Sequence, residues 1–497
     1  MFALLLPPMG IIQRQGITNT LIAYSGILVG FVNLLVLQPY LLTPEEVGLV
    51  RILYSVSLLF SSIFPVGISS FTLKYFPYFR NPEKGHHGFF WIITGATALL
   101  YILFSTVGYF FKDIIIEKYT EKSFLFTEYF NYVLPMGLFM GFIAVLTAYC
   151  FALFKPNFPS FLNELFNRLA FTILLSLYFL KLITIHSFIA GYVLIYGLQF
   201  IILTVFIYKN DRITVFPQWN FLKPYLNRQT FLFTSMFGFA GIASIGLKNV
   251  DVALLGGFVS LDKVAVYSIA VLIGTLIEIP SNVLNRITDG RISDALAKND
   301  LNTVDKIYKD SVRYLTVVGG FLFLLLIVNL QNGLSFLPAE YRNGYWVTII
   351  IASSSLINMS TGTNSSIIYF SKKYLYGIFL LLLLIVTTFL LNFWLIPNME
   401  ILGAAFATGI SAFLFNVSKC LVIYRIFKFQ PYNYHYLILV LFFSCALMLN
   451  FVLPVLDSVF LDLIYRNSSV LLLYIVGVFF SKLIPENLNI ISRKTYP

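Results

Sequence analysis

Charged residues are scarce in this 497-residue chain. Asp, Glu, Lys and Arg together make up 11% of it, whereas soluble domains carry about 25%. A surface that contacts water cannot be built from so little charge, so the composition excludes a soluble globular protein. Hydrophobic residues make up 59% of the chain, and its mean hydropathy is +0.85. The composition therefore predicts an integral membrane protein.

Cysteine and histidine are also scarce. The three cysteines lie in apolar runs, and their spacing fits neither a disulfide framework nor a metal site (Cys150, Cys420 and Cys445). The four histidines are scattered near the expected membrane edges (His86, His87, His186 and His435). His86 and His87 are adjacent, but a solvated loop pair is favoured over a metal site. No cofactor or metal is expected.

Long apolar runs are abundant, and they lack the alternation of an outer-membrane barrel. A helix needs about 20 residues to cross a bilayer. About fourteen such spans are predicted, near residues 17–41, 47–70, 88–111, 129–153, 162–181, 187–208, 230–252, 263–286, 313–334, 345–369, 375–396, 401–424, 436–456 and 467–484. The fold class is therefore all-α, a polytopic membrane protein.

Lys and Arg are unevenly distributed between the loops. With the N-terminus inside, about 24 basic residues, Lys419 among them, fall on the inner side and about 9 on the outer side. This bias predicts that both termini are cytoplasmic. Together with anionic lipid headgroups, it explains the net charge of +11. It does not require a nucleic-acid partner.

The longest inner loop spans residues 287–312. Within it, Leu301, Val304 and Val312 recur at helical spacing after the cap-like Asp300. The pattern predicts a short amphipathic helix that lies on the inner membrane surface.

The sequence repeats itself at an offset of roughly 212 to 217 residues. PEEVGLVRI at 44–52 aligns with LDKVAVYSI at 261–269, and HSFIAGYVL at 186–194 aligns with NMEILGAAF at 398–406. The first copy covers spans one to six and the second covers spans seven to twelve, in the same orientation. The predicted division is an N-terminal lobe at 1–212, a C-terminal lobe at 213–430 and two further spans with a tail at 431–497. Two parallel halves are typical of transporters.

At this point the chain resembles a known family. It is similar to the Wzx-type polysaccharide (O-antigen) flippases of the multidrug/oligosaccharidyl-lipid/polysaccharide (MOP) exporter superfamily. The segments that carry the resemblance are PEEVGLVRIL at 44–53, GISSFTLKYFP at 67–77, KNVDVALLGGFVSLDKVAVYSIA at 248–270, RISDALAKNDLNTVDKIYKDSVRY at 291–314 and ILGAAFATGIS at 401–411. Ala265 departs from the glycine that relatives often carry there.

The resemblance implies two six-helix lobes plus two C-terminal helices in a V-shaped MOP/MATE-like fold, with a central cavity lined by spans one, two, seven and eight. It implies a bacterial inner-membrane protein that moves undecaprenyl-pyrophosphate-linked oligosaccharide from the inner to the outer leaflet, for lipopolysaccharide or other polysaccharide. Membrane lipids, and a glycan polymerase or other assembly proteins, are the implied partners. H+ and Na+ both stay open as a coupling ion.

Charges inside a membrane span are costly and are functional candidates. We expect Arg51 and Lys248 to bind the phosphates because cations suit anionic groups, with Arg286 or Lys74 at the inner entrance. The remaining binding candidates are the polar residues Asn33, Gln38 and Asp251.

Each candidate also has a structural interpretation. Arg51, like Arg168 in span five, would snorkel to the interface, and Lys248 would pair with Asp251. Glu278 is a coupling or gating candidate, but it would also be stable as a protonated or hydrogen-bonded carboxyl. Pro65 and Pro280 either allow bending or form static kinks.

Three rival functions fit less well. A drug/cation antiporter of the same superfamily favours carboxylates in the first lobe, and spans one to four contain none. The sequence alone distinguishes a lipid II flippase poorly from a polysaccharide flippase. A membrane enzyme usually needs a large outer domain, yet the outer loops are short and no DxD or HExxH pattern occurs; no enzymatic activity is expected.

Overall fold

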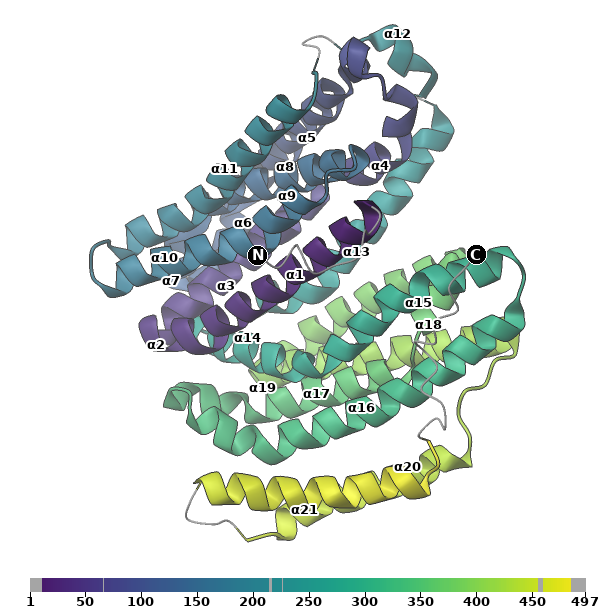
Figure 1. Ribbon diagram of the computed structural model, residues 1–497. Helices are drawn as coiled ribbons and strands as arrows, with labels where there is room; N and C mark the ends of the chain where they lie inside the picture. Colours follow the sequence, from purple (N-terminus) through teal and green to yellow (C-terminus); the bar gives the residue numbers. More distant parts are fainter. Residues whose placement is uncertain (1–10, 66, 214–216, 226, 455–458, 484–497) are drawn as a thin grey trace. The chain divides into compact units, whose positions relative to one another are not determined.

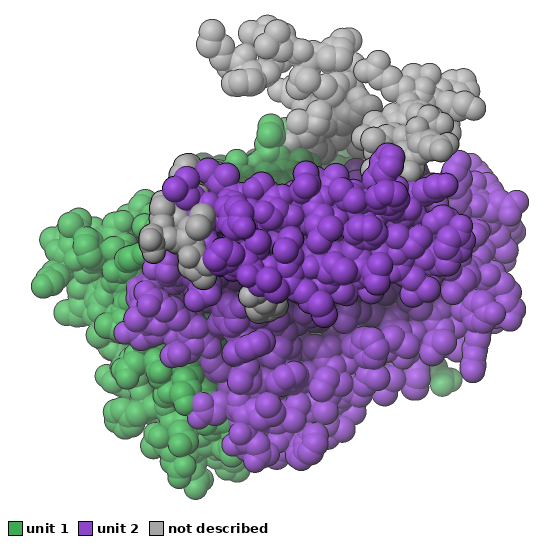
Figure 2. Space-filling view, turned by 90° about the horizontal axis from the view of Figure 1, so that it is seen from below, with its two compact units in different colours: residues 1–268 green, residues 269–497 purple. Residues whose placement is uncertain are grey.

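The structure is a computed structural model that describes residues 11–65, 67–213, 217–225, 227–454 and 459–483. These residues form helices and connecting turns and contain no β-strand, which confirms the all-α fold class. They divide into two compact units, residues 1–268 and residues 269–497 (Figure 1; Figure 2 colours the units separately).

Unit 1 contains the helices up to α13 and the start of α14. Its α-helices are α1 (Ile11–Val32), α2 (Gln38–Leu41), α3 (Pro44–Ile63), α4 (Ile68–Phe79), α5 (Phe89–Phe110), α6 (Lys112–Thr120), α7 (Phe124–Tyr129), α8 (Val133–Ala152), α9 (Asn157–Phe161), α10 (Asn167–Phe179), α11 (Ile185–Asn210), α12 (Trp219–Leu222) and α13 (Arg228–Gly256). Two π-helical turns, η2 (Asn33–Leu37) and η5 (Leu162–Phe166), interrupt the first and fifth spans. Three 3-10 segments complete the unit: η3 (Pro82–Gly88), η4 (Phe130–Tyr132) and η6 (Lys223–Tyr225).

Unit 2 continues from α14 (Leu261–Thr275), which crosses the boundary between the units. It holds the 3-10 turn η7 (Leu276–Glu278), α15 (Ile279–Ala297), α16 (Leu301–Ser335), the 3-10 segment η8 (Ala339–Gly344), α17 (Tyr345–Ser360), α18 (Asn364–Phe370), α19 (Tyr374–Phe427), α20 (Tyr434–Val452) and α21 (Val459–Phe480). Glu400, with a φ of 53°, breaks α19 into the two spans predicted from sequence.

Within the described residues, each predicted span lies mostly on helical residues. Among the described residues, nine helices are long and apolar enough to cross a membrane by length and composition. Large apolar side chains point away from the protein on many of these helices, for example Leu99 (70% exposed) and Phe479 (73% exposed). Such surfaces suit contact with lipid tails. The total of fourteen spans stays a prediction.

The second predicted span, 47–70, is broken rather than continuous. Helix α3 ends at Ile63, and α4 begins at Ile68 after a turn that contains Pro65. Gly67 has a φ of 78°, and a Cβ atom there would lie 2.0 Å from the carbonyl oxygen of Thr234 in α13. Only glycine fits this turn without strain, so Pro65 and Gly67 together end one helix and start another.

The predicted amphipathic surface helix is wrong. Residues 301–312 are the first part of the 35-residue helix α16, whose N-cap is Asp300 as expected. Val304, Tyr308 and Val312 are almost completely buried in a core cluster with residues of α15, α18 and α19. A helix with one apolar face packs equally well on lipid or on protein, and here that face packs on the rest of unit 2.

The predicted division of the chain at residue 212 differs from the boundary of the compact units. Helix α13 packs along α3 and α4, so it lies in unit 1. The N-terminal turns of the two repeat copies also meet: a Cβ atom on Gly48 would lie 1.9 Å from the carbonyl oxygen of Leu261. The division into two lobes, which rests on the internal repeat, stays a prediction.

The two appended helices attach to unit 2 through α21. Helices α20 and α21 lie side by side (Figure 1), and α21 packs on α16. Within α21, Arg466 pairs with Asp462 at 2.9 Å; between α21 and α16, Asn467 exchanges hydrogen bonds with Asn329 at 2.8 Å. Interhelical polar contacts of this kind hold helices together where water is absent.

Substitution of Gly67 tests the turn between α3 and α4 and its close contact with α13. Gly67→Ala should lower the free energy of unfolding by about 2–5 kcal/mol, because the new methyl group clashes with Thr234 and the left-handed backbone is strained. The measurement is the thermal unfolding midpoint of the purified protein in detergent. The control is Gly95→Ala, whose Cβ atom meets nothing within 4 Å. Equal midpoints for the two variants would contradict the assignment.

Candidate functional site

A group of polar residues gathers among the spans of unit 1. We name it the arginine cluster; its members are Asn33, Gln38, Arg51, Tyr54, Glu164, Arg168 and Thr172. Four elements supply these residues: the end of the first span, α3, η5 and α10. Three of the sequence-predicted candidates, Asn33, Gln38 and Arg51, therefore belong to one cluster.

The first half of the cluster surrounds Arg51. Its guanidinium donates a hydrogen bond to Gln38 Oε1 at 3.1 Å. Tyr54, one turn further along α3, interacts electrostatically with Arg51, Arg168 and Glu164. Arg51 therefore contacts another polar residue of unit 1.

The second half of the cluster surrounds Arg168. Its guanidinium pairs with Glu164 at 3.2 Å, and these side chains are 33% and 40% exposed. Asn33 donates from Nδ2 to the carbonyl oxygen of Arg168 at 2.9 Å and accepts from Thr172 at 2.8 Å. Arg168 therefore pairs with a carboxylate one turn away. The named groups carry two positive formal charges and one negative charge, so the cluster is net cationic.

Two glycines allow the elements of the cluster to approach. A Cβ atom on Gly26 would lie 2.4 Å from the carbonyl oxygen of Glu164, and one on Gly30 would lie 2.9 Å from the guanidinium of Arg168. Their GxxxG spacing is typical of close helix contacts in membranes. This spacing predicts that another helix packs closely on the first span, but it does not identify Arg168 as the partner.

Each partner segment also contains a π-helical turn beside the contact. Asn33 begins η2 and Glu164 lies in η5. A π turn inserts an extra residue and redirects side chains, and such turns are frequent at functional sites. Both turns place a polar side chain where the cluster needs it.

The other candidates in unit 1 are placed on α4 and α13. Asp251 is 6% exposed and accepts a hydrogen bond from Tyr267 at 3.0 Å. The backbone of Lys248 lies in α13, but its side chain lies outside the described part of the chain. Lys74 is exposed, and its ammonium lies 3.6 Å from the centre of the Phe233 ring of α13.

The remaining candidates belong to unit 2. Arg286 is exposed on α15, and Glu278 ends the 3-10 turn η7. Pro280 follows as the second residue of α15, at the join between the two helical types. The structure therefore does not gather all the predicted residues in one unit.

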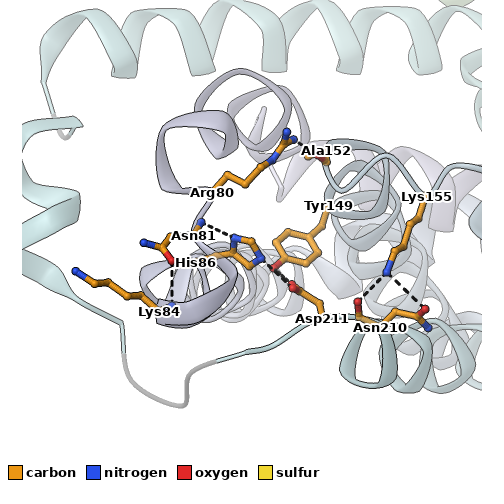
Figure 3. Close-up of polar contacts among 9 residues, drawn as sticks. All are labelled: Arg80, Asn81, Lys84, His86, Tyr149, Ala152, Lys155, Asn210 and Asp211. Carbon is orange, nitrogen blue, oxygen red and sulfur yellow. Dashed lines mark hydrogen bonds and ion pairs between the residues drawn. The ribbon is translucent and has the colours of Figure 1, made fainter. Parts of the chain in front are cut away.

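The histidine pair differs from the solvated loop expected from sequence. His86 and His87 are 2% and 8% exposed. His86 Nε2 lies 2.8 Å from Asp211 Oδ1, while its Nδ1 accepts from the Asn81 amide at 3.1 Å (Figure 3). Tyr149 donates to Asp211 Oδ2 at 2.6 Å. The contacts tie η3 to α8 and α11.

His87 is enclosed by other side chains of unit 1. His87 Nδ1 contacts Gln218 Oε1 at 2.6 Å, and its ring stacks on Phe221 with the centroids 3.9 Å apart. Within the described residues, no group of three or more metal-ligating side chains occurs. One run of four residues with left-handed backbone, Gly85–Gly88, lets the segment turn inward.

The fold and this polar interior define the class of molecule: a multi-pass α-helical membrane protein with the fold of MOP-superfamily transporters. No protein-family model and no curated protein matches the sequence. The chain is similar to a solved structure of the lipid II flippase MurJ in an inward closed conformation, with 16% identity and a TM-score of 0.72 over 94% of this chain and 100% of that one.

Two further solved structures are those of a multidrug resistance MATE family transporter of the MOP superfamily. The inward-facing form has a TM-score of 0.63 at 11% identity and covers 85% of this chain and 96% of the other. The outward-facing form has a TM-score of 0.55 at 11% identity, with coverage of 84% and 96%. At these identities the likeness shows the fold alone, which is the MOP/MATE-like fold implied by the sequence resemblance.

Asp211, the partner of His86 and Tyr149, makes the stability of the fold depend on pH. Burial alone would raise the pKa of this carboxyl, but hydrogen bonds from His86 and Tyr149 hold its pKa below its usual value. A carboxyl with a lowered pKa in the folded state stabilises the fold above its unfolded pKa of about 3.9 and loses that contribution as the pH falls. Asp211→Asn should therefore be less stable than the wild type by about 1–3 kcal/mol at neutral pH.

The test compares thermal midpoints between pH 7 and pH 3, where the difference between wild type and Asp211→Asn should shrink. Asp294→Asn is the matched control, because its ion pair with Lys298 is solvent-exposed and such pairs contribute little. A difference for Asp211→Asn that stays constant down to pH 3 would refute the role assigned to the carboxylate.

Proposed function

We propose that this chain is a flippase that moves an undecaprenyl-pyrophosphate-linked oligosaccharide from the inner to the outer leaflet of the bacterial cytoplasmic membrane, for polysaccharide biosynthesis. The observation that carries the proposal is the net cationic arginine cluster inside unit 1. A transporter of an anionic headgroup needs such charges within its membrane part, whereas a carrier of organic cations needs carboxylates.

Arg51 is the phosphate-binding residue of the proposal, together with Lys248 of α13. A guanidinium binds phosphate oxygens through two parallel hydrogen bonds and stays charged in a membrane. Gln38, Asn33 and Tyr54 supply hydrogen-bonding groups of the kind that sugars and phosphates use. Lys74 and Arg286 carry the charge at the inner entrance, and Asp251 orients the binding groups of α13.

The transport direction follows from electrostatics. An inside-negative membrane potential favours outward movement of an anion by about 2.3 kcal/mol per charge per 100 mV. Conformational change is assigned to Pro65, at the break between α3 and α4, and to Pro280 beside η7. Glu278, whose charge acts on Lys419, is the gating carboxylate and the proposed contact for a coupling ion, H+ or Na+.

Two alternative cargoes belong to the same fold. Lipid II is the cargo named for the MurJ structure, and multidrug transport is named for the MATE structures. The arginine cluster favours an anionic lipid-linked cargo over a cationic drug. Within the described part of the first four spans, the spans themselves supply no carboxylate to this cluster; its one acidic member is Glu164 in η5.

The test is flipping in reconstituted vesicles. A fluorescent undecaprenyl-pyrophosphate glycan is placed in one leaflet, and its appearance in the other is followed for the wild type and for Arg51→Ala/Lys248→Ala. The double variant should flip at least about tenfold more slowly, because it loses charge-assisted contacts with the phosphates. The matched control is Lys84→Ala/Lys209→Ala, which removes two exposed charges of unit 1.

Parallel vesicles contain lipid II or an organic cation with a proton gradient. Flipping of lipid II but not of the other glycan would assign the chain to the lipid II alternative. Proton-linked cation efflux without glycolipid movement would overturn the flippase proposal and the phosphate role of Arg51.

A further inference from the structure

The last part of α19 carries a lysine that is buried inside unit 2. Lys419 is 3% exposed, although its sequence position near the end of a span suggested an inner-loop residue. Its ammonium donates a hydrogen bond to Ser365 Oγ at 3.0 Å and lies 4.3 Å from the centre of the Phe415 ring. Among the described residues, no carboxylate lies within 4 Å of this ammonium. A buried charge without a paired countercharge is strongly unfavourable.

A second buried donor lies beside the first. Asn364 is 1% exposed at the start of α18, and its Oδ1 accepts a hydrogen bond from Ser365 Oγ at 3.3 Å. Its amide Nδ2 makes no hydrogen bond to the described residues. The Ser365 hydroxyl therefore links the Lys419 ammonium to the Asn364 amide oxygen. Most N–H donors of Lys419 and Asn364 have no hydrogen-bond acceptor among the described residues.

The neighbouring polar groups are engaged elsewhere. Asn416, one turn before Lys419, accepts from Thr361 at 3.1 Å. Asp289 of α15 accepts from Ser366 at 2.5 Å. Glu278 acts on Lys419 electrostatically but lies beyond ion-pair distance. The leftover donors around Ser365 thus need an acceptor that these side chains do not supply.

We propose that Lys419, Asn364 and Ser365 form a buried binding site for one small monovalent anion of the size of chloride. An anion accepts hydrogen bonds from Lys419 Nζ and Asn364 Nδ2 and also compensates the ammonium charge. A water molecule accepts the hydrogen bonds but leaves the charge uncompensated. The proposed anion is a small one because both donor side chains are buried, Lys419 being 3% and Asn364 1% exposed. The site lies entirely within unit 2, so this inference does not depend on the cargo proposed above.

The experiment uses the purified full-length protein in a neutral detergent. Sodium chloride is replaced stepwise by sodium gluconate at constant ionic strength, and the thermal unfolding midpoint is measured. The wild-type midpoint should rise with chloride, because a ligand that binds only the folded state stabilises it in proportion to occupancy. Lys419→Met should lose this chloride dependence. In gluconate its midpoint should exceed that of the wild type, because the uncompensated charge is gone.

Lys372→Met is the control for general salt effects, because Lys372 is exposed in the same unit; it should keep the wild-type chloride response. Equal wild-type midpoints in chloride and gluconate would overturn the proposal, as would an unchanged chloride response in Lys419→Met. If Lys419→Met fails to fold, crystals of the wild type grown in bromide decide the question. An anomalous peak within hydrogen-bond distance of Lys419 Nζ supports the site, and no peak there overturns it.

Discussion

A polar group in hydrocarbon has no water to bond, so its partners have to come from the protein itself. This constraint explains why the polar residues of the spans gather in clusters instead of being spread along the helices. Where both partners are satisfied, as between Asn329 of α16 and Asn467 of α21, the polar contact joins helices. Where donors are left over, as around Lys419, the cluster can take a ligand. The completeness of hydrogen bonding thus separates structural contacts from candidate sites.

The fold was largely predictable because length and apolar character suffice to define a membrane helix. The break at Glu400 falls between two of the predicted spans. The turn at Gly67 was not predictable, because a hydropathy average does not detect a turn that depends on the backbone conformation of one residue. The amphipathic segment 301–312 was recognised as a helix but assigned to the wrong surface. Its apolar face is the same whether it covers lipid or protein.

The candidate site was predictable only in part, and the reason is distance along the chain. Asn33, Gln38 and Arg51 were identified because polar residues are rare in apolar runs. Their partner Arg168 lies more than a hundred residues away, and no local pattern connects it to Asn33. For Lys419 and His86 the sequence predicted exposed positions, whereas the structure shows both side chains buried. Both looked like residues of membrane edges, yet the surrounding helices enclose them.

The contact between Gly48 and Leu261 has a consequence for biogenesis. Unit 1 includes α13 and the first turns of α14, so the surface of α3 that receives them is incomplete while only the first repeat has been synthesised. Membrane insertion proceeds from the N-terminus, and the early helices must wait in the bilayer with part of their packing surface facing lipid. The nascent protein is thus open to insertion chaperones and membrane proteases until the second repeat has begun to leave the ribosome.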